Sequence, residues 1–325
     1  MLLASLALAA DLPEPIEPAT ALTSPTLEDQ TPWRATVATI GTLTTASGVA
    51  LRPAAGGTDG PPFDTVVLAD LGASVRVATD WGNVRVVVSV PRTDLATVPV
   101  GRVRLGLDPP AKTAFVDLFG GTPVTTAPSG NRIAVTVAHG GLSARGTLPK
   151  DALGQVWRRD APEWGASDLA AEATLDFRDA PNGHPIASYR EEAEYQACTL
   201  VGAGAPQGGW REVELRARDG IVHGWVVETA VHAGEQGLGG VGSLGRGRGV
   251  SGPRVTLGAG VAIRAQVGDE PFARTLREAQ MDLLGRQGGL AHVRFGTPWG
   301  LLDGWVDCSH EGAPGPGSSL RCDAG

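Results

Sequence analysis

The chain has 325 residues, and its 42% hydrophobic content is enough to build packed cores in more than one domain. Its 46 glycines and 24 prolines follow no short period, which indicates many turns and excludes a collagen-like chain. The formal net charge of −8 argues against nucleic acid as a partner, because no basic excess is present to neutralise phosphates.

Residues 1–10, MLLASLALAA, predict a signal-peptide-like leader, since a short apolar run ends in small residues at Ala7 and Ala9. An ordinary apolar N-terminus is the alternative, because no basic segment precedes the run. With a leader, we expect an exported protein, periplasmic or extracellular. No other stretch reaches the roughly 20 apolar residues of a membrane-spanning helix, so the protein is predicted not to span a membrane.

Residues 11–32 contain five prolines and five acidic residues and few bulky apolar groups. A segment of this composition buries too little apolar surface to offset the entropy lost on ordering. We therefore predict a disordered linker.

A short motif recurs four times after residue 32: a glycine, any residue, proline or alanine, and then, in each copy, an aliphatic residue. The spacing is too irregular for a solenoid and indicates small independent modules in tandem. The copies begin at Gly48, Gly121, Gly183 and Gly260.

Alternating apolar and polar residues predict β-hairpins within these modules. Residues 74–77 and 84–88 flank a turn at 80–83, residues 132–137 precede the turn His139-Gly140-Gly141, and residues 212–216 precede Asp219-Gly220.

One segment of the last module admits a helix. Phe272, Leu276, Ala279 and Leu283 have helical spacing, but the equivalent stretch 195–201 alternates in the manner of a strand. We predict strands in both.

Each module closes with a second recurring element, at residues 89–95, 148–153, 224–226 and 304–306. The last two read Gly-Trp-Val, and there the sequence resembles bacterial SH3-like (SH3b) domains, in which such a strand follows a hairpin and ends a small barrel. The first two modules depart from the pattern, with Val90 and Leu148 in place of the tryptophan.

The resemblance implies an all-β fold of tandem small SH3-like β-barrels, joined by Gly/Pro-rich linkers and with little helix. The expected boundaries are module 1 at 33–100, module 2 at 101–160, module 3 at 161–233, a Gly-rich linker or loop at 234–252, module 4 at 253–308 and a flexible tail at 309–325.

Domains of this family are commonly non-catalytic modules of exported bacterial proteins, some of which contact peptidoglycan. The resemblance therefore implies a non-enzymatic binding or scaffold protein whose partner is peptidoglycan or an envelope protein. A structural subunit of an extracellular assembly and an accessory module of a cell-wall hydrolase remain the alternatives.

The tryptophans divide into two groups by position. Trp225 and Trp305 belong to closing strands and are predicted to be buried. Trp81, at a hairpin tip, together with Trp210 and Trp299, is predicted to be exposed and to bind a ligand by stacking.

Three cysteines are present, and Cys308 and Cys322 bracket a Gly/Pro/Ser-rich tail that a disulfide would staple. Cys198 is predicted to be a buried thiol.

No residue is predicted to be catalytic, because Cys198 and His223 lack the sequence context of a cysteine enzyme. The six histidines show no metal-ligand spacing, so no metal is expected. The glycine pattern at 237–242 lacks a strand before it and a helix after it, so no cofactor is expected either.

Overall fold

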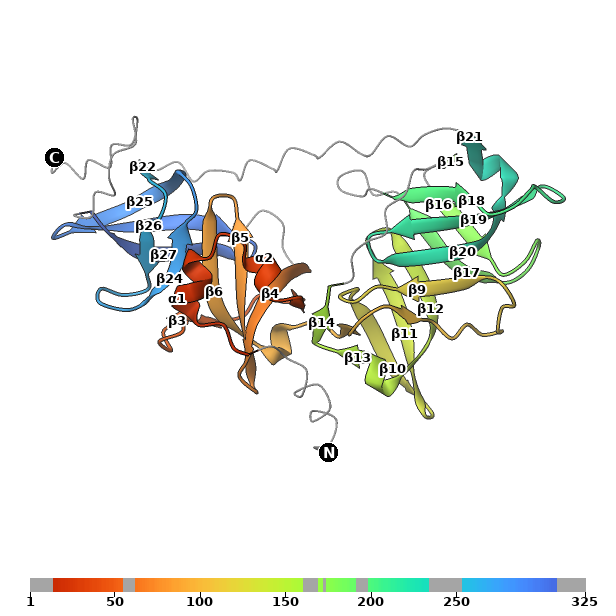
Figure 1. Cartoon of the computed structure of the whole chain (residues 1–325), viewed down its shortest axis with the longest axis horizontal. Coiled ribbons are helices and arrows are strands. Elements are labelled where there is room, and N and C mark those ends of the chain that lie inside the picture. The colour runs from red at the N-terminus through yellow and green to blue at the C-terminus, as the bar shows by residue number, and fades with distance from the viewer. Residues whose placement is uncertain are drawn as a thin grey trace. The chain divides into compact units, whose positions relative to one another are not determined.

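The computed structural model describes residues 14–54, 62–159, 169–171, 174–190, 198–233 and 253–308. The predicted leader, the Gly-rich linker and the tail lie outside these described residues. Antiparallel strands dominate the rest, which confirms the all-β prediction (Figure 1). The helices of the described segments are short, and none is long and apolar enough to cross a membrane.

The chain divides into two compact units that are nested in sequence. Unit 1 comprises residues 1–95 and 245–325, and unit 2 comprises residues 96–244. Module 4 thus folds with module 1, and module 3 folds with module 2, whereas we expected four independent modules. The boundary after module 1 lies at residue 95 instead of 100, because Val98–Pro99 pairs with Leu153–Gly154 in unit 2.

Unit 1 contains an antiparallel sheet in the order β1-β4-β5-β6-β24-β23-β27-β26-β25-β22, with β2 pairing with β3 and β6 beside it. Its strands are β1 (Trp33–Val37), β2 (Leu43–Thr44), β3 (Ala50–Leu51), β4 (Phe63–Asp70), β5 (Ser74–Trp81), β6 (Val84–Pro91), β22 (Arg254–Leu257), β23 (Ala262–Arg264), β24 (Pro271–Thr275), β25 (Ala279–Gln287), β26 (Leu290–Thr297) and β27 (Gly300–Asp307).

Unit 2 contains a sheet in the order β10-β11-β12-β17-β16-β20-β19-β18, which β9 and β8 extend from β20. The strands of the unit are β7 (Val98–Pro99), β8 (Val103–Arg104), β9 (Phe115–Leu118), β10 (Val124–Ser129), β11 (Arg132–His139), β12 (Leu142–Pro149), β13 (Leu153–Gly154), β14 (Val156–Arg158), β15 (Leu169–Ala171), β16 (Thr174–Arg178), β17 (Pro185–Arg190), β18 (Thr199–Gly202), β19 (Trp210–Ala217), β20 (Gly220–Val227) and β21 (Val231–Ala233).

The predicted hairpins are present. Tight turns join β5 to β6 and β11 to β12, and they are built at Gly82 and Gly140, whose φ angles of 56° and 58° suit a residue without Cβ. The segment with helical spacing forms the strands β24 and β25, as predicted. Its apolar residues pack inward, with Phe272 and Met281 buried.

The first three modules share one arrangement of their closing elements. A closing strand (β6, β12 or β20) is followed by one turn of 3-10 helix, and the next residues pair antiparallel with the opening segment of the same module. The 3-10 turns are Arg92–Asp94, Lys150–Ala152 and Glu228–Ala230. The resulting pairs are Val37 with Leu95, β7 with β13, and β15 with β21.

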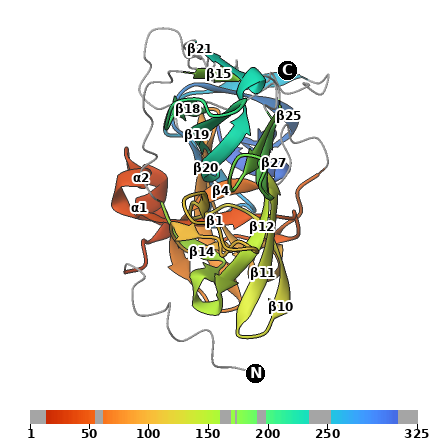
Figure 2. The same cartoon turned by 90° about the vertical axis from the view of Figure 1, so that its right-hand side faces the viewer.

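Equivalent strand pairs join the two modules in each unit. In unit 1, β6 pairs with β24 and Ala54 pairs with Leu301 of β27. In unit 2, β12 pairs with β17 and β9 pairs with β20, so that the strands of modules 2 and 3 lie side by side (Figures 1 and 2). Each unit therefore repeats the same junction between a pair of modules.

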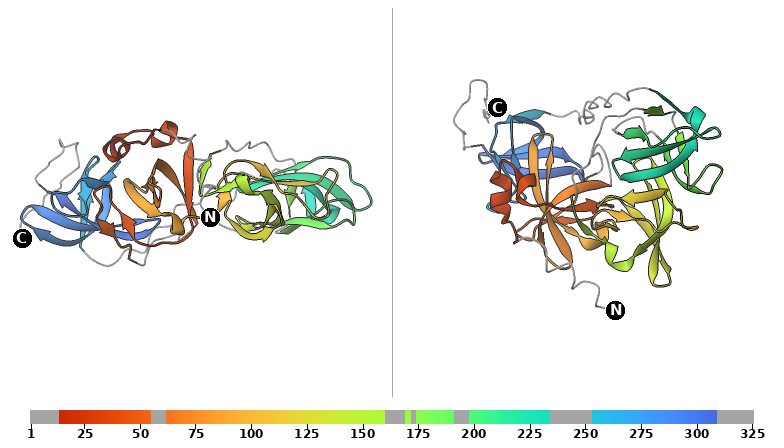
Figure 3. Two further views of the ribbon diagram at one scale, coloured as in Figure 1. Left: turned by 90° about the horizontal axis from the view of Figure 1, so that it is seen from below. Right: turned by 45° about the vertical axis from the view of Figure 1, so that its right-hand side comes forward.

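Residues 14–32 are ordered, which corrects the prediction of a disordered linker. They contain α1 (Pro18–Thr23) and α2 (Leu27–Gln30), and Figure 3 shows both helices over strands of unit 1. Ala21, Leu22 and Leu27 are buried in a cluster with apolar residues of β4, β5 and β6. The average composition of the segment gives little weight to these few apolar residues. They are enough to order the segment when they pack against a face of the sheet.

Arg85 of β6 joins this N-terminal segment to the sheet. Its guanidinium, buried with 3% of the side chain exposed, forms two hydrogen bonds of 2.6 and 2.7 Å with the carboxylate of Asp80. It also donates to the carbonyls of Ala21, at 3.0 Å, and Ser24. These carbonyls lie at the end of α1, where the helix itself offers them no donor.

Candidate functional site

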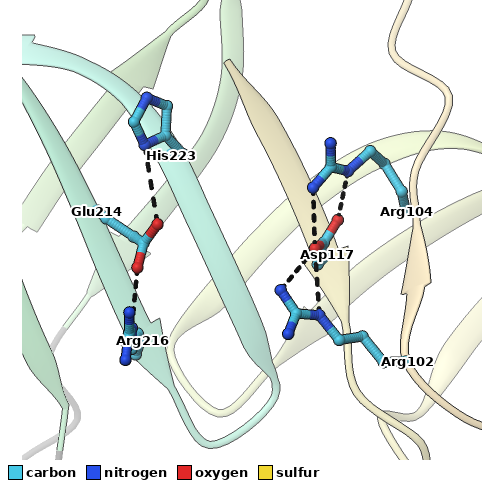
Figure 4. Close-up of polar contacts among 6 residues, drawn as sticks. All are labelled: Arg102, Arg104, Asp117, Glu214, Arg216 and His223. Carbon is cyan, nitrogen blue, oxygen red and sulfur yellow. Dashed lines mark hydrogen bonds and ion pairs between the residues drawn. The ribbon is translucent and has the colours of Figure 1, made fainter. Parts of the chain in front are cut away.

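The candidate site lies on the outer face of unit 2, across the neighbouring strands β8, β9, β20 and β19. Successive side chains of a strand point to opposite faces, and one face of these strands packs into the core through residues such as Val116, Val222 and Leu215. The opposite face carries charged and aromatic side chains, which we call the outer-face cluster: Arg102, Arg104, Phe115, Asp117, Glu212, Glu214, Arg216 and His223. Figure 4 draws these residues except Phe115 and Glu212.

Asp117 binds two arginines at one end of the cluster. Arg104 donates from Nε to Oδ1 at 2.7 Å and from Nη2 to Oδ2 at 3.1 Å. Arg102 donates from Nε and Nη2 to Oδ2 at 3.2 and 2.9 Å. The Asp117 side chain is only 6% exposed, whereas those of Arg102 and Arg104 are 43% and 59% exposed. A buried carboxylate is thus covered by two solvent-facing guanidinium groups.

These contacts hold Asp117 ionised. Burial raises the pKa of Asp117, but the hydrogen bonds from Arg104 and Arg102 outweigh burial, and the net pKa lies below the usual range of an aspartate. The hydrogen bond to Asp117 likewise raises the pKa of Arg104. Asp117 therefore contributes a fixed charge and hydrogen-bond acceptors to the site.

Phe115 and His223 form the centre of the cluster. They are directly opposite in the β9–β20 pair, and their rings stack with centroids 5.2 Å apart and an interplanar angle of 6°. The Arg104 guanidinium lies over the Phe115 ring, with Cζ 3.9 Å from the ring centroid. Ring stacking and cation–π contact fix all three side chains in place.

Glu212, Glu214 and Arg216 form the acidic end on β19. His223 Nε2 lies 3.2 Å from Oε1 of Glu212, and His223 Nδ1 lies 3.9 Å from Oε2 of Glu214. Arg216 donates from Nε to Oε1 of Glu214 at 2.8 Å (Figure 4). The cluster thus changes from a basic end at β8 to an acidic end at β19.

Unit 1 has a corresponding cross-strand pair on β26 and β27. Its acidic residue lies on the second strand of the hairpin, whereas in unit 2 the acidic residue lies on the first. Glu214 is opposite His223 in unit 2, and Arg294 is opposite Asp303 at the equivalent place before Gly304. Arg294 makes bonds of 2.6 and 2.8 Å to the Asp303 carboxylate, which raise the pKa of Arg294. The corresponding positions of the two units therefore differ in charge.

The three tryptophans predicted to be exposed have different environments. Trp210 begins β19, is half-buried, and lies on the same face as Glu212, with the Arg178 guanidinium 5.5 Å from its ring centroid. Trp81 ends β5 in unit 1 and is also half-buried. Trp299 is only 1% exposed and contacts Phe63 edge to face. Trp299 therefore cannot form a binding surface, and this prediction is wrong.

The tryptophans of the closing strands are partly as predicted. Trp225 is buried, with 9% of the residue exposed. Trp305 is half-buried and stacks on His292, with ring centroids 4.6 Å apart.

Cys308 is disulfide-bonded, and its predicted partner Cys322 lies outside the described residues. Cys198 carries a thiol that is half-buried against the core of unit 2. His223 lies on the outer face with Phe115 and Glu212, so Cys198 and His223 have separate environments. Within the described segments, no group of three or more His, Cys, Asp or Glu side chains could hold a metal ion.

Sequence reasoning missed Arg102, Arg104, Phe115 and Asp117. The signal was the alternation of polar and apolar residues in 102–105, RVRL, and in 115–118, FVDL. That pattern indicates two strands with a polar outer face, but it does not say that the two strands are neighbours.

Comparison with known proteins adds no relative. No family model, no curated protein and no solved structure matches the chain.

Proposed function

We propose that this chain is an exported, non-enzymatic binding or scaffold protein built of SH3-like modules, which contacts peptidoglycan or an envelope protein through the outer face of unit 2. One observation supports the SH3-like assignment. The Gly-Trp-Val segments at 224–226 and 304–306 lie in β20 and β27, each of which is the second strand of an antiparallel hairpin, with β19 and β26 as the first strands.

The observation that carries the binding proposal is the outer-face cluster. Charged and aromatic side chains occupy four neighbouring strands there, and ring stacking and hydrogen bonds already hold them in one conformation. A ligand that binds such a surface loses less side-chain entropy on association than one that must order mobile groups. Trp210, on the same face, adds a large apolar ring for contact.

Sedimentation with isolated cell walls tests the proposal. We expect the wild-type chain to sediment with the walls and Trp210→Ala to remain largely in the supernatant. Trp305→Ala is the matched control, because Trp305 is also half-buried but lies in unit 1 and is not among the predicted binding residues. Purified peptidoglycan and washed envelopes, used in parallel, separate the two proposed partners.

The proposal is wrong if the wild-type chain stays in the supernatant with both preparations. Equal sedimentation of Trp210→Ala and wild type would remove the outer face as the contact surface. Circular dichroism of each variant confirms that the fold is retained.

A further inference from the structure

We propose that Arg102 and Arg104, held in position by Asp117, form a binding site for a carboxylate group. This inference rests on the proposed function, because it assigns the chemistry of one end of the same outer face. The occupant is the carboxylate of a peptide-like ligand, either a chain terminus or an acidic side chain.

The first argument is that each arginine keeps N–H donors that Asp117 does not use. Each arginine uses Nε and Nη2 to bind Asp117. The Nη1 groups of both take part in none of the hydrogen bonds found among the described residues. With 43% and 59% of their side chains exposed, both guanidinium groups are accessible to a ligand. A guanidinium offers planar pairs of N–H donors that match the two oxygens of a carboxylate.

The second argument is charge. One arginine is enough to neutralise one carboxylate, as Arg294 does for Asp303 and Arg85 does for Asp80. Asp117 has two arginines, so this end of the cluster has one positive charge in excess. A singly charged carboxylate matches that excess.

The third argument is preorganisation. Asp117 is buried, so its carboxylate has little room to move, and its hydrogen bonds hold both guanidinium groups in position. Arg104 is also stacked on Phe115, which is itself stacked on His223. The entropy of ordering two long side chains is therefore spent before a ligand arrives.

Nuclear magnetic resonance of the arginine Nε–H groups tests the site in the full chain. We would titrate the protein with N-acetylglycine, with N-acetylglycinamide as the uncharged match, and with inorganic phosphate, at constant ionic strength. N-acetylglycine should give saturable shifts of the Arg102 and Arg104 signals, and N-acetylglycinamide should give none. Phosphate should bind more weakly than N-acetylglycine.

Three variants assign the response to residues. Arg102→Gln and Arg104→Gln should each weaken N-acetylglycine binding about tenfold, the effect of losing one charge-assisted hydrogen-bonding partner. Arg294→Gln is the matched control, because it removes an arginine that pairs one-to-one with a carboxylate in unit 1. It should leave the titration unchanged.

Asp117→Asn tests the positioning role against charge alone. Removal of a negative charge would strengthen anion binding if only net charge mattered. Because Asp117 positions both arginines, we expect binding to weaken about fivefold instead. Tighter binding by Asp117→Asn would overturn the positioning role.

The carboxylate site is wrong if the shifts never saturate, if either arginine variant titrates like the wild type, or if phosphate binds more tightly than N-acetylglycine. The test also separates this inference from the proposed function. Saturable N-acetylglycine binding without cell-wall sedimentation would remove only the proposed function. Cell-wall sedimentation without N-acetylglycine binding would remove only the carboxylate site.

Discussion

The glycines of the two Gly-Trp-Val closures are required by a close approach between strands. A Cβ on Gly224 would lie 2.7 Å from the carbonyl oxygen of Arg178, and a Cβ on Gly304 would lie 3.0 Å from that of Arg264 and even closer to Ile263. Arg178 and Arg264 pair with Trp225 and Trp305 at equivalent places beside a β-bulge. Glycine at this position lets the neighbouring strand pass.

We therefore predict that Gly304→Ala lowers the free energy of unfolding by about 1–3 kcal/mol, the usual effect of forcing a methyl group into packed surroundings. Gly296→Ala is the control, because nothing lies within 4 Å of its added Cβ on the adjacent strand. Urea denaturation of both variants measures the difference. Equal midpoints for the two variants would contradict the packing argument.

Asp117 makes stability depend on pH in a defined direction. Its pKa in the folded protein lies below the ordinary value of an aspartate, so its contribution to stability is complete above about pH 4 and is lost as the pH falls through the folded pKa. We predict that Asp117→Asn lowers the free energy of unfolding by about 1–3 kcal/mol at pH 7. The difference between wild type and variant should shrink at pH 3. Denaturant titrations at both pH values measure it, and a difference that grows toward low pH would contradict the assignment.

Single residues of the site were only partly predictable. Trp210 was predicted to be exposed, and it is half-buried at the start of β19 on the same face as Glu212. Trp299 was wrongly predicted to be exposed, because the Phe63 ring that covers it comes from a distant part of the chain. Asp117 and its arginines gave no local signal of their contacts, which depend on strand pairing.

At the scale of elements, hairpins were predictable and the helices were not. The turns at Gly82 and Gly140 lie between strands that follow each other directly, so alternation and turn residues specify both partners. Helix α1 is too short to be stable alone and depends on the sheet beneath Leu22 and on the hydrogen bonds from Arg85. Composition averaged over residues 11–32 concealed that dependence.

We predict that Arg85→Gln releases the N-terminal helices and lowers the free energy of unfolding by about 2–3 kcal/mol, because hydrogen bonds of a buried charged group are lost. Arg92→Gln is the control, since Arg92 and Asp70 form a partly exposed ion pair, and such pairs contribute about 0–1 kcal/mol. Limited proteolysis within residues 14–32, together with denaturation, measures both effects. Unchanged protease resistance of Arg85→Gln would contradict the anchoring role.

At the scale of the whole molecule, the sequence indicated four repeated segments but not which segments join. Modules 1 and 4 meet through β6 and β24, and local alternation is the same for any two compatible strand edges. The pairing of first with last and of second with third follows from tertiary packing. The resemblance to single domains carried no information about it.

The nested arrangement predicts how truncation acts. A chain that ends at residue 233 keeps the described strands of unit 2 but removes β24, so β6 loses its neighbour. We expect the amides of β6 to exchange hydrogen at least about tenfold faster, while β11 and β12 keep their protection. Hydrogen exchange followed by mass spectrometry reads both regions in one experiment. Unchanged protection of β6 would show that module 1 stands without module 4.

During synthesis, strand β6 stays without its neighbour until β24 has been made. Val84 pairs with Thr275, about 190 residues later, which a ribosome adding about 5–20 residues per second reaches after roughly 10–40 s. In that interval the valine-rich edge of β6 can pair with other chains. Arg85, the second residue of VRVVV, places a charge within that edge, so we expect the residue that anchors α1 in the finished protein also to oppose aggregation of the nascent one.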